Sequence, residues 1–253
     1  MKNFIFTILV FFSLNTFASI AILSDLDDTI KITQSSGNVG DLLGDKVFTA
    51  IPDFFRATKD YSNELHVLSA SPELIRGHVT HVLHKHVIRF KSLTLRESIL
   101  EDKFDFKFRE IKRILDASTD DFILIGDDLG EDPEVYSAIA GLYPNRILDV
   151  YIRVINGRPL KKKKSLTTYY TSFDLFLREY EAGRMGYSWV KTALDKLIKE
   201  VRTEYIFPKK AKCPTTYHVW QWQYETDFSN DARALVQKLT AACRVRQSVN
   251  ILP

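Results

Sequence analysis

The chain has 253 residues, which is enough to bury the core of one domain, or of one domain with a small appendage. Its formal charge of +3 is too small to indicate a nucleic-acid partner, and its hydrophobic share of 45% is that of an ordinary globular protein. No internal repeat or long low-complexity segment is present, which excludes a repeat protein.

The first 18 residues have the layout of a secretory signal peptide. Lys2 precedes an apolar run at residues 4–14, and Thr16, Phe17 and Ala18 form an acceptable cleavage site. The run is too short for a convincing transmembrane helix. We therefore expect residues 1–18 to be removed by cleavage after Ala18 and the protein to be exported, to the periplasm or outside the cell. The alternatives are an uncleaved anchor and a buried first strand.

From residue 19 onward, short apolar runs alternate with segments in which apolar residues have helical spacing. Strands are predicted at residues 20–24, 65–71, 87–96, 121–128 and 147–155. Helices are predicted at residues 48–61, 72–86, 106–118, 132–144, 172–183, 189–201 and 231–245. This alternation indicates an α/β fold, a parallel sheet with helices on both faces. We expect one domain at residues 19–184 and a helical C-terminal extension at residues 185–253.

Polar side chains gather where three of the predicted strands end. Asp25 and Asp27 follow the first strand, Ser69 lies near the end of the second, and Asp127 lies at the end of the buried strand that starts at residue 121. The carboxyl ends of parallel strands share one edge of the sheet, where such sheets bind their ligands. The sequence therefore predicts a single polar site at that edge.

These residue types suit the hydrolysis of a phosphate monoester. Asp25 could attack phosphorus and form an aspartyl-phosphate, while Asp27 could protonate the leaving oxygen and later activate water. Ser69 could donate a hydrogen bond to a phosphoryl oxygen, and Lys107 could neutralise the developing charge. Carboxylates are ligands that Mg²⁺ prefers, so Asp127, with Asp132, could complete a metal shell. Thr29 suits the turn that follows the first strand.

Four segments carry a resemblance to a known family. "DLDDT" resembles the nucleophile motif of the haloacid dehalogenase (HAD) superfamily. More narrowly, "SDLDDTIKIT", "LSASPE", "FKFREIKRIL" and "ILIGDDLGEDPEVY" are similar to the catalytic domain of the actin-patch-associated phosphatidate phosphatases, which resembles that of the lipin phosphatases. The resemblance covers about residues 20–183. It implies a HAD-like, Rossmann-like α/β sheet, Mg²⁺ as the cofactor and phosphatidic acid as the substrate. The short segment between the first two motifs leaves room for a small cap or none.

The resemblance also assigns roles to individual residues. It implies that Asp25 is the nucleophile and Asp27 the acid/base, with Ser69 and Lys107 completing the catalytic group. Thr29, Ser69 and Lys107 would bind the substrate phosphate. The implied metal ligands are Asp25, Asp27 (through its carbonyl), Asp127 and Asp132.

The chain departs from the family pattern at three positions. Asp128 stands where a serine is usual, which we expect to add negative charge near the metal. Glu73 replaces a common aromatic residue, and Phe106 replaces a common histidine.

Three questions stay open at this point. The expected function is the hydrolysis of a phosphatidate-like lipid. The alternatives are a phosphatase for small soluble phosphate esters and a non-catalytic module that binds anionic lipid. Lys161–Lys164 would contact an anionic membrane or form a solvated loop. Cys213 and Cys243 would form a disulfide in an oxidising compartment, or remain two free thiols in a helical core.

Overall fold

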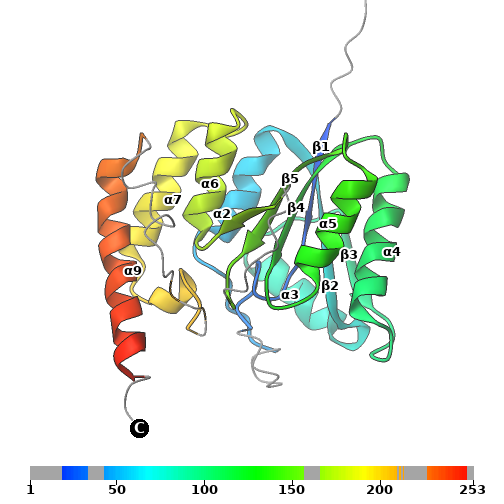
Figure 1. Cartoon of the computed structure of the whole chain (residues 1–253), viewed down its shortest axis with the longest axis horizontal. Helices are drawn as coiled ribbons and strands as arrows, with labels where there is room; N and C mark the ends of the chain where they lie inside the picture. Colours follow the sequence, from blue (N-terminus) through cyan, green and yellow to red (C-terminus); the bar gives the residue numbers. More distant parts are fainter. Residues whose placement is uncertain are drawn as a thin grey trace, which may run out of the picture.

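The computed structural model describes residues 19–33, 43–156, 166–209, 211, 213 and 227–249. Six parallel strands form one sheet in the order β3-β2-β1-β4-β5-β6 (Figure 1). The strands are β1 (Ile20–Ser24), β2 (Ser62–Pro72), β3 (Ser92–Arg96), β4 (Asp121–Asp127), β5 (Ile147–Arg153) and β6 (Thr167–Tyr169). The predicted α/β fold is confirmed, and it is Rossmann-like.

Strand β1 lies in the middle of the sheet, and both of its faces are covered. Its apolar residues are buried on alternate sides, Ile22 in one hydrophobic cluster and Leu23 in the other. Ser24, its last residue, pairs with Val67 of β2 and with Ile125 of β4. A continuous apolar strand of this kind is typical of a parallel sheet buried on both faces.

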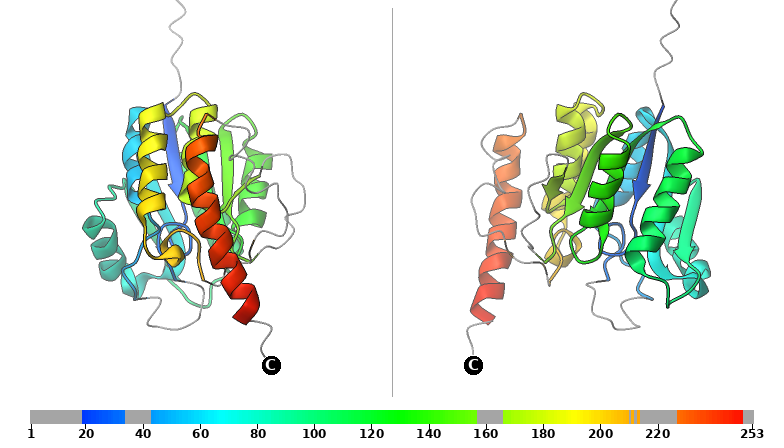
Figure 2. Two further views of the ribbon diagram at one scale, coloured as in Figure 1. Left: turned by 90° about the vertical axis from the view of Figure 1, so that its left-hand side faces the viewer. Right: turned by 45° about the vertical axis from the view of Figure 1, so that its right-hand side comes forward.

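Helices cover the two faces of the sheet unequally. Helices α4 (Lys103–Asp116) and α5 (Asp132–Leu142) pack on one face, and α2 (Ile51–Ala57), α3 (Arg76–Lys85) and α6 (Ser172–Glu181) pack on the other (Figures 1 and 2). Three short 3-10 helices complete the described elements: η1 (Thr58–Asp60), η2 (Glu73–Ile75) and η3 (Thr203–Tyr205). Within the described residues between β1 and β2, the helices α2 and η1 belong to this layer, so that part of the chain contains no separate cap domain.

The C-terminal helices extend the second face outward. Helix α7 (Tyr187–Lys199) packs on α6, and α9 (Ser229–Val249) packs on α7 and forms the outer end of the molecule (Figure 2). Leu194 of α7 and Leu235 of α9 belong to the same hydrophobic cluster as α2 and α6. A disulfide joins Cys213 to Cys243, as predicted for an oxidising compartment. The predicted boundary after residue 184 falls between α6 and α7.

One strand prediction was wrong in part, and one short strand was not predicted. Strand β3 begins at Ser92 and not at residue 87, because Val87 takes a left-handed backbone conformation (φ 58°) in the turn that ends α3. The three-residue edge strand β6 was not predicted, because so short a run carries no detectable alternation. The predicted signal peptide and Lys161–Lys164 lie outside the described residues. Among the residues that are described, no helix has both the length and the apolar character needed to cross a membrane.

Candidate active site

The loop after β1 turns sharply as soon as the strand ends. The amide of Asp25 still donates to Ile125 O of the neighbouring strand (2.8 Å), and the carbonyl of Leu26 then accepts two amides from residues four and five positions on. Asp28 takes a left-handed conformation (φ 56°), and its carboxylate accepts from the amide and hydroxyl of Thr33 (3.1 and 2.7 Å). The Asp28 carboxylate therefore holds the loop in shape. The carboxylates of Asp25 and Asp27 are the ones that contribute to the site.

Three buried carboxylates meet at the carboxyl edge of the sheet. Asp25 follows β1, Asp127 ends β4 and Asp132 begins α5, and one carboxylate oxygen from each lies within 4.8 Å of the others. The amide of Asp127 also donates to Asp132 Oδ2 (3.3 Å). Gly126 makes this approach possible, since a Cβ at that position would lie 2.4 Å from Asp132 Oδ2. The predicted convergence of these three aspartates is confirmed.

Lys107 of α4 is the cation of the cluster. Its Nζ donates to Asp25 Oδ1 (2.8 Å) and also pairs with Asp132. Burial alone would lower the pKa of Lys107, but Asp132 and Asp25 raise it above its usual value. Burial raises the pKa of Asp25 to about 8 against the opposing effect of Lys107, and it raises that of Asp127 well above its usual range. One lysine thus leaves three buried carboxylates short of positive charge.

This charge deficit fits a divalent cation. Mg²⁺ binds hard oxygen ligands, usually a few carboxylates with water completing the shell. Asp25, Asp127 and Asp132 supply three such oxygens that lie within 4.8 Å of one another, and all three residues are buried. The carboxylate of Asp27 is not a member of this group. The expectation that the backbone carbonyl of Asp27 binds the metal stays a prediction.

Asp27 is held by two serines of β2. Ser69 Oγ and Ser71 Oγ both donate to Asp27 Oδ2 (3.0 and 2.7 Å), and Ser69 Oγ accepts from the amide of Ser71 (3.0 Å). Asp27 Oδ1 is buried and has no hydrogen-bond partner among the described residues. The arrangement leaves one carboxyl oxygen available to carry a proton. Ser71 was not identified from the sequence, although its two-residue spacing from Ser69 places both on one side of a strand.

Behind this loop lies a buried arginine that was also not identified. Arg153, the last residue of β5, is fully buried and donates from Nη2 to Thr29 O (3.2 Å) and from Nη1 to Tyr170 O (3.3 Å). Its guanidinium lies 3.9 Å from the ring centre of Phe48 and 4.7 Å from that of Tyr169. Arg153 therefore ties the end of β5 to the catalytic loop. The Thr29 hydroxyl is buried without a hydrogen-bond partner among the described residues, and its predicted contact with phosphate stays a prediction.

Asp128 holds the loop that follows β5. Its Oδ1 accepts from the amides of Ile155 and Asn156 (2.7 Å each), in the loop that follows β5. Two amide donors stabilise the negative charge there. The Asp128 carboxylate thus fastens the neighbouring loop, and its expected contribution of negative charge near the metal stays a prediction.

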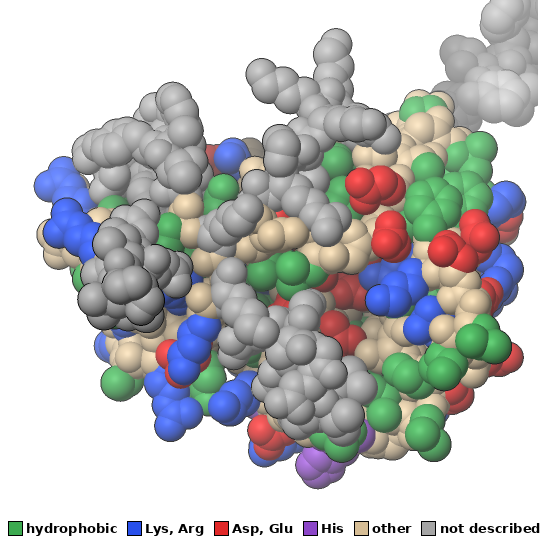
Figure 3. Space-filling model, turned by 60° about the horizontal axis from the view of Figure 1, so that its bottom comes forward, with side chains coloured by type: hydrophobic (Ala, Val, Ile, Leu, Met, Phe, Trp, Pro, Cys, Tyr) green, Lys and Arg blue, Asp and Glu red, His purple; other side chains and the backbone are tan. Residues whose placement is uncertain are grey.

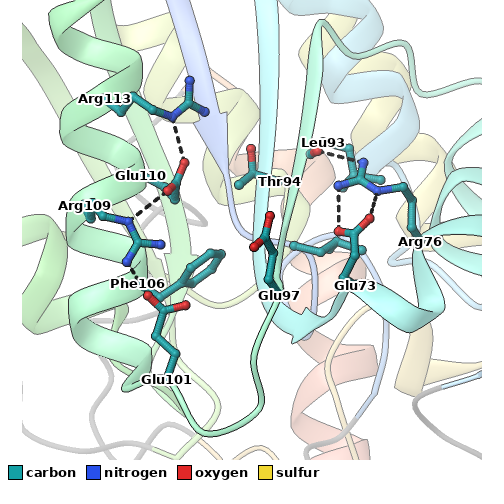
Figure 4. Close-up of a pocket in the computed structure, with 11 residues that line it drawn as sticks. Glu73, Arg76, Leu93, Thr94, Glu97, Glu101, Phe106, Arg109, Glu110 and Arg113 are labelled. Atoms are coloured by element: carbon teal, nitrogen blue, oxygen red, sulfur yellow. Dashed lines mark hydrogen bonds and ion pairs between the residues drawn. The ribbon is translucent and has the colours of Figure 1, made fainter.

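A polar pocket of about 600 Å³ opens beside the site (Figure 4). Phe106, the neighbour of Lys107, forms part of its wall, as does Glu73, two residues after Ser71. Ion pairs surround the pocket: Arg76 with Glu73, Arg109 with Glu101, and Arg113 with Glu110. Thr94 and Glu97 lie between the Arg76–Glu73 pair on one side and the two pairs formed by Arg109 and Arg113 on the other (Figure 4). Two of the positions that depart from the family pattern therefore line this pocket.

Comparison with known proteins places this site in a family. In Schizosaccharomyces pombe, the uncharacterized protein C29B5.04c is 26% identical over 150 residues, which cover 53% of this chain and 25% of that protein. The chain thus spans about a quarter of the length of this relative. The family model of the catalytic domain of phosphatidate phosphatase APP1 matches residues 20–154, just over half of the chain, and includes all of the site residues described above except Asn156, Ile155, Tyr169 and Tyr170. The chain therefore belongs to the family of the phosphatidate phosphatase APP1 catalytic domain.

Proposed function

We propose that the protein is a Mg²⁺-dependent phosphatase that hydrolyses a phosphatidate-like phosphomonoester through an aspartyl-phosphate on Asp25. The observation that carries the proposal is the grouping of Asp25, Asp127 and Asp132 around Lys107, with Asp27 held beside them. Family membership supports a phosphatase, and the geometry supports the division of roles among these residues.

The reaction proceeds in two balanced steps. In the first, a carboxylate oxygen of Asp25 bonds to phosphorus, the bond to the leaving oxygen breaks, and the proton on Asp27 moves to that oxygen. In the second, water attacks the phosphorus of the acyl phosphate, Asp27 takes its proton, and Asp25 is released with free phosphate. Ser69 and Ser71 fix the orientation of Asp27 throughout. When bound, Mg²⁺ would neutralise charge on the phosphoryl oxygens and reduce their repulsion from Asp25.

A lipid substrate is the first choice among the alternatives. The segment between the first two motifs is too short for a large cap domain, which favours a bulky substrate, and the family model names a phosphatidate phosphatase. The charged pocket supplies the contrary observation, since ion pairs suit a polar leaving group better than acyl chains. A phosphatase for small soluble esters is therefore the second candidate. A lipid-binding module without activity would have no need of the Asp25–Lys107 pair.

Export is proposed with this function. The Cys213–Cys243 disulfide supports an oxidising compartment, where such bonds persist.

Phosphate release by the purified protein tests the proposal, with phosphatidate vesicles and a soluble phosphomonoester as substrates and with Mg²⁺ or a chelator. We expect Mg²⁺-dependent release that Asp25→Asn abolishes without lowering the melting temperature. The matched control is Asp116→Asn, which changes an exposed carboxylate at the end of α4 and should leave the rate intact. Full activity in Asp25→Asn would refute the aspartyl-phosphate mechanism. A preference for the soluble ester would keep the mechanism and discard the lipid.

A further inference from the structure

Three aliphatic side chains are almost completely exposed. Among the large hydrophobic residues that the structure describes, Leu74 (94%), Leu100 (91%) and Val201 (89%) have the highest exposed fractions. Single exposed aliphatic residues are ordinary on protein surfaces. These three differ because they lie at the same edge of the sheet as the active site.

Leu74 and Leu100 lie on the same side of the carboxyl edge. Leu74 is in η2, directly after β2, and Leu100 is in the loop between β3 and α4. Their neighbours Glu73 and Glu101 line the same pocket beside the active site. Both leucines therefore follow strands whose carboxyl ends lie at the edge of the active site, and each is next in the chain to a residue that lines the pocket.

Val201 lies at the same edge beyond the other side of the site. It follows α7 and Glu200, whose carboxylate accepts from Thr49 Oγ1 (3.0 Å). Phe48, next to Thr49, covers the guanidinium of Arg153 at the carboxyl end of β5. Figure 1 shows the same arrangement: the segment after α7 returns to the lower edge, where β1 and β4 also end.

We propose that the carboxyl edge of the sheet docks on a lipid bilayer, with Leu74, Leu100 and Val201 entering its surface on both sides of the catalytic centre. The proposal rests on the proposed function, because a lipid that stays in the bilayer must present its phosphate to Asp25 from this edge. Figure 3, which turns this edge toward the viewer, shows acidic side chains near the middle of the face and hydrophobic ones gathered at its lower right.

The distribution of these residues favours a bilayer over a protein partner. A protein interface needs a continuous apolar centre with shape complementarity, whereas the acyl region of a bilayer accepts separate side chains without a fixed shape. Charge does not attract the Leu100 side to an anionic bilayer, since the loop at residues 97–102 carries Glu97, Glu101 and Asp102 and no cation. Docking there depends on apolar insertion, so it should survive high salt.

Vesicle flotation in Asp25→Asn protein, which does not consume the lipid, tests the docking. The vesicles contain phosphatidylcholine with 10 mol% phosphatidate, and binding is measured at low and high salt. The test variant is Leu74→Ser with Leu100→Ser, and Val201→Ser is made separately. The matched control is Leu142→Ser with Leu148→Ser, at the end of α5 and the start of β5, on the opposite edge of the sheet (52% and 40% exposed).

We expect the test variant to bind vesicles about tenfold more weakly or worse, and the control to bind within about twofold of the parent. In the active background, the test variant should keep its rate on a soluble ester. Flotation equal to the parent, an equal loss in the control, or a parent protein that does not float would each overturn the proposal. A dimer that the test variant converts to a monomer would assign the leucines to a second copy of the chain instead.

The same data separate this proposal from the proposed function. A protein that floats through its leucines but releases no phosphate from phosphatidate supports the docking and removes the substrate. A protein that hydrolyses phosphatidate and does not float keeps the substrate and removes the docking.

Discussion

Replacing Gly126 by alanine should disable the active site through a single methyl group. The added Cβ would lie 2.4 Å from Asp132 Oδ2 and 2.8 Å from both Cβ and Cγ of Asp132. Rotation of the carboxylate cannot relieve the clash, because the Cβ of Asp132 is itself too close. The first turn of α5 must therefore move away from β4.

The size of that movement follows from the distances. Recovering a contact of 3.0–3.4 Å requires a displacement of roughly 0.6–1 Å at the carboxylate oxygen. Mg²⁺ tolerates little deviation from octahedral geometry, and an error of about 1 Å in a catalytic group can lower a rate by about 100-fold. Stability should fall by only about 1–3 kcal/mol, the usual cost of overpacking a core. We thus expect Gly126→Ala to fold, to bind Mg²⁺ weakly and to be about 100-fold slower.

Gly130→Ala is the matched control. It makes the same change four residues later, in the loop between β4 and α5, where a Cβ would meet nothing within 4 Å. Mg²⁺ affinity by calorimetry and phosphate release should separate the two variants, with thermal melting to confirm folding. Parental affinity and rate in Gly126→Ala would refute the requirement for this close approach. Equal losses in both variants would show that any added methyl group between the end of β4 and α5 is harmful.

Three further changes give distinct outcomes. Ser71→Ala removes one of two donors to Asp27 and should lower kcat about tenfold with KM unchanged; parental kcat would leave the positioning to the other serine. Arg153→Met deprives two backbone carbonyls of their donor and should lower the free energy of urea unfolding by about 2–5 kcal/mol, whereas an unchanged value would contradict a role in joining β5 to the loop. Cys213→Ser opens the disulfide ring and should lower the unfolding free energy by about 3–4 kcal/mol, a loss that reductant reproduces in the parent; insensitivity of both would refute a stabilising bond.

The sequence was sufficient to predict the three carboxylates and the lysine that the fold brings together. Asp25 is distant in the chain from Asp127 and Asp132, but each lies at a strand end or shortly after one, and parallel topology alone places such ends at a common edge. Lys107 could be added because it belongs to a motif of the family. For Cys213 and Cys243 the sequence left two alternatives, a disulfide or two free thiols, and the structure shows the disulfide.

Other features depend on contacts that a linear pattern does not contain. Asp128 looks like one more acid of the motif, and only the amides of the loop after β5 reveal its structural use. Arg153 ends an apolar strand and would be expected in solvent, yet two aromatic rings from distant segments enclose it. The exposure of Leu74 depends on how η2 leaves the sheet, which hydrophobicity along the chain does not show.

The central position of β1 also bears on how the site responds to local opening. Asp25, the proposed nucleophile, follows a strand that is hydrogen-bonded on both sides, and its amide makes the last bond to β4. Opening of that amide to solvent requires separation of β1 from β4 in the middle of the sheet, and central strands commonly separate only on global unfolding. The edge strands and the outer helix α9 can detach without disturbing it. Hydrogen exchange at the nucleophile should thus be among the slowest in the molecule, and fluctuations at the periphery should leave catalytic geometry intact.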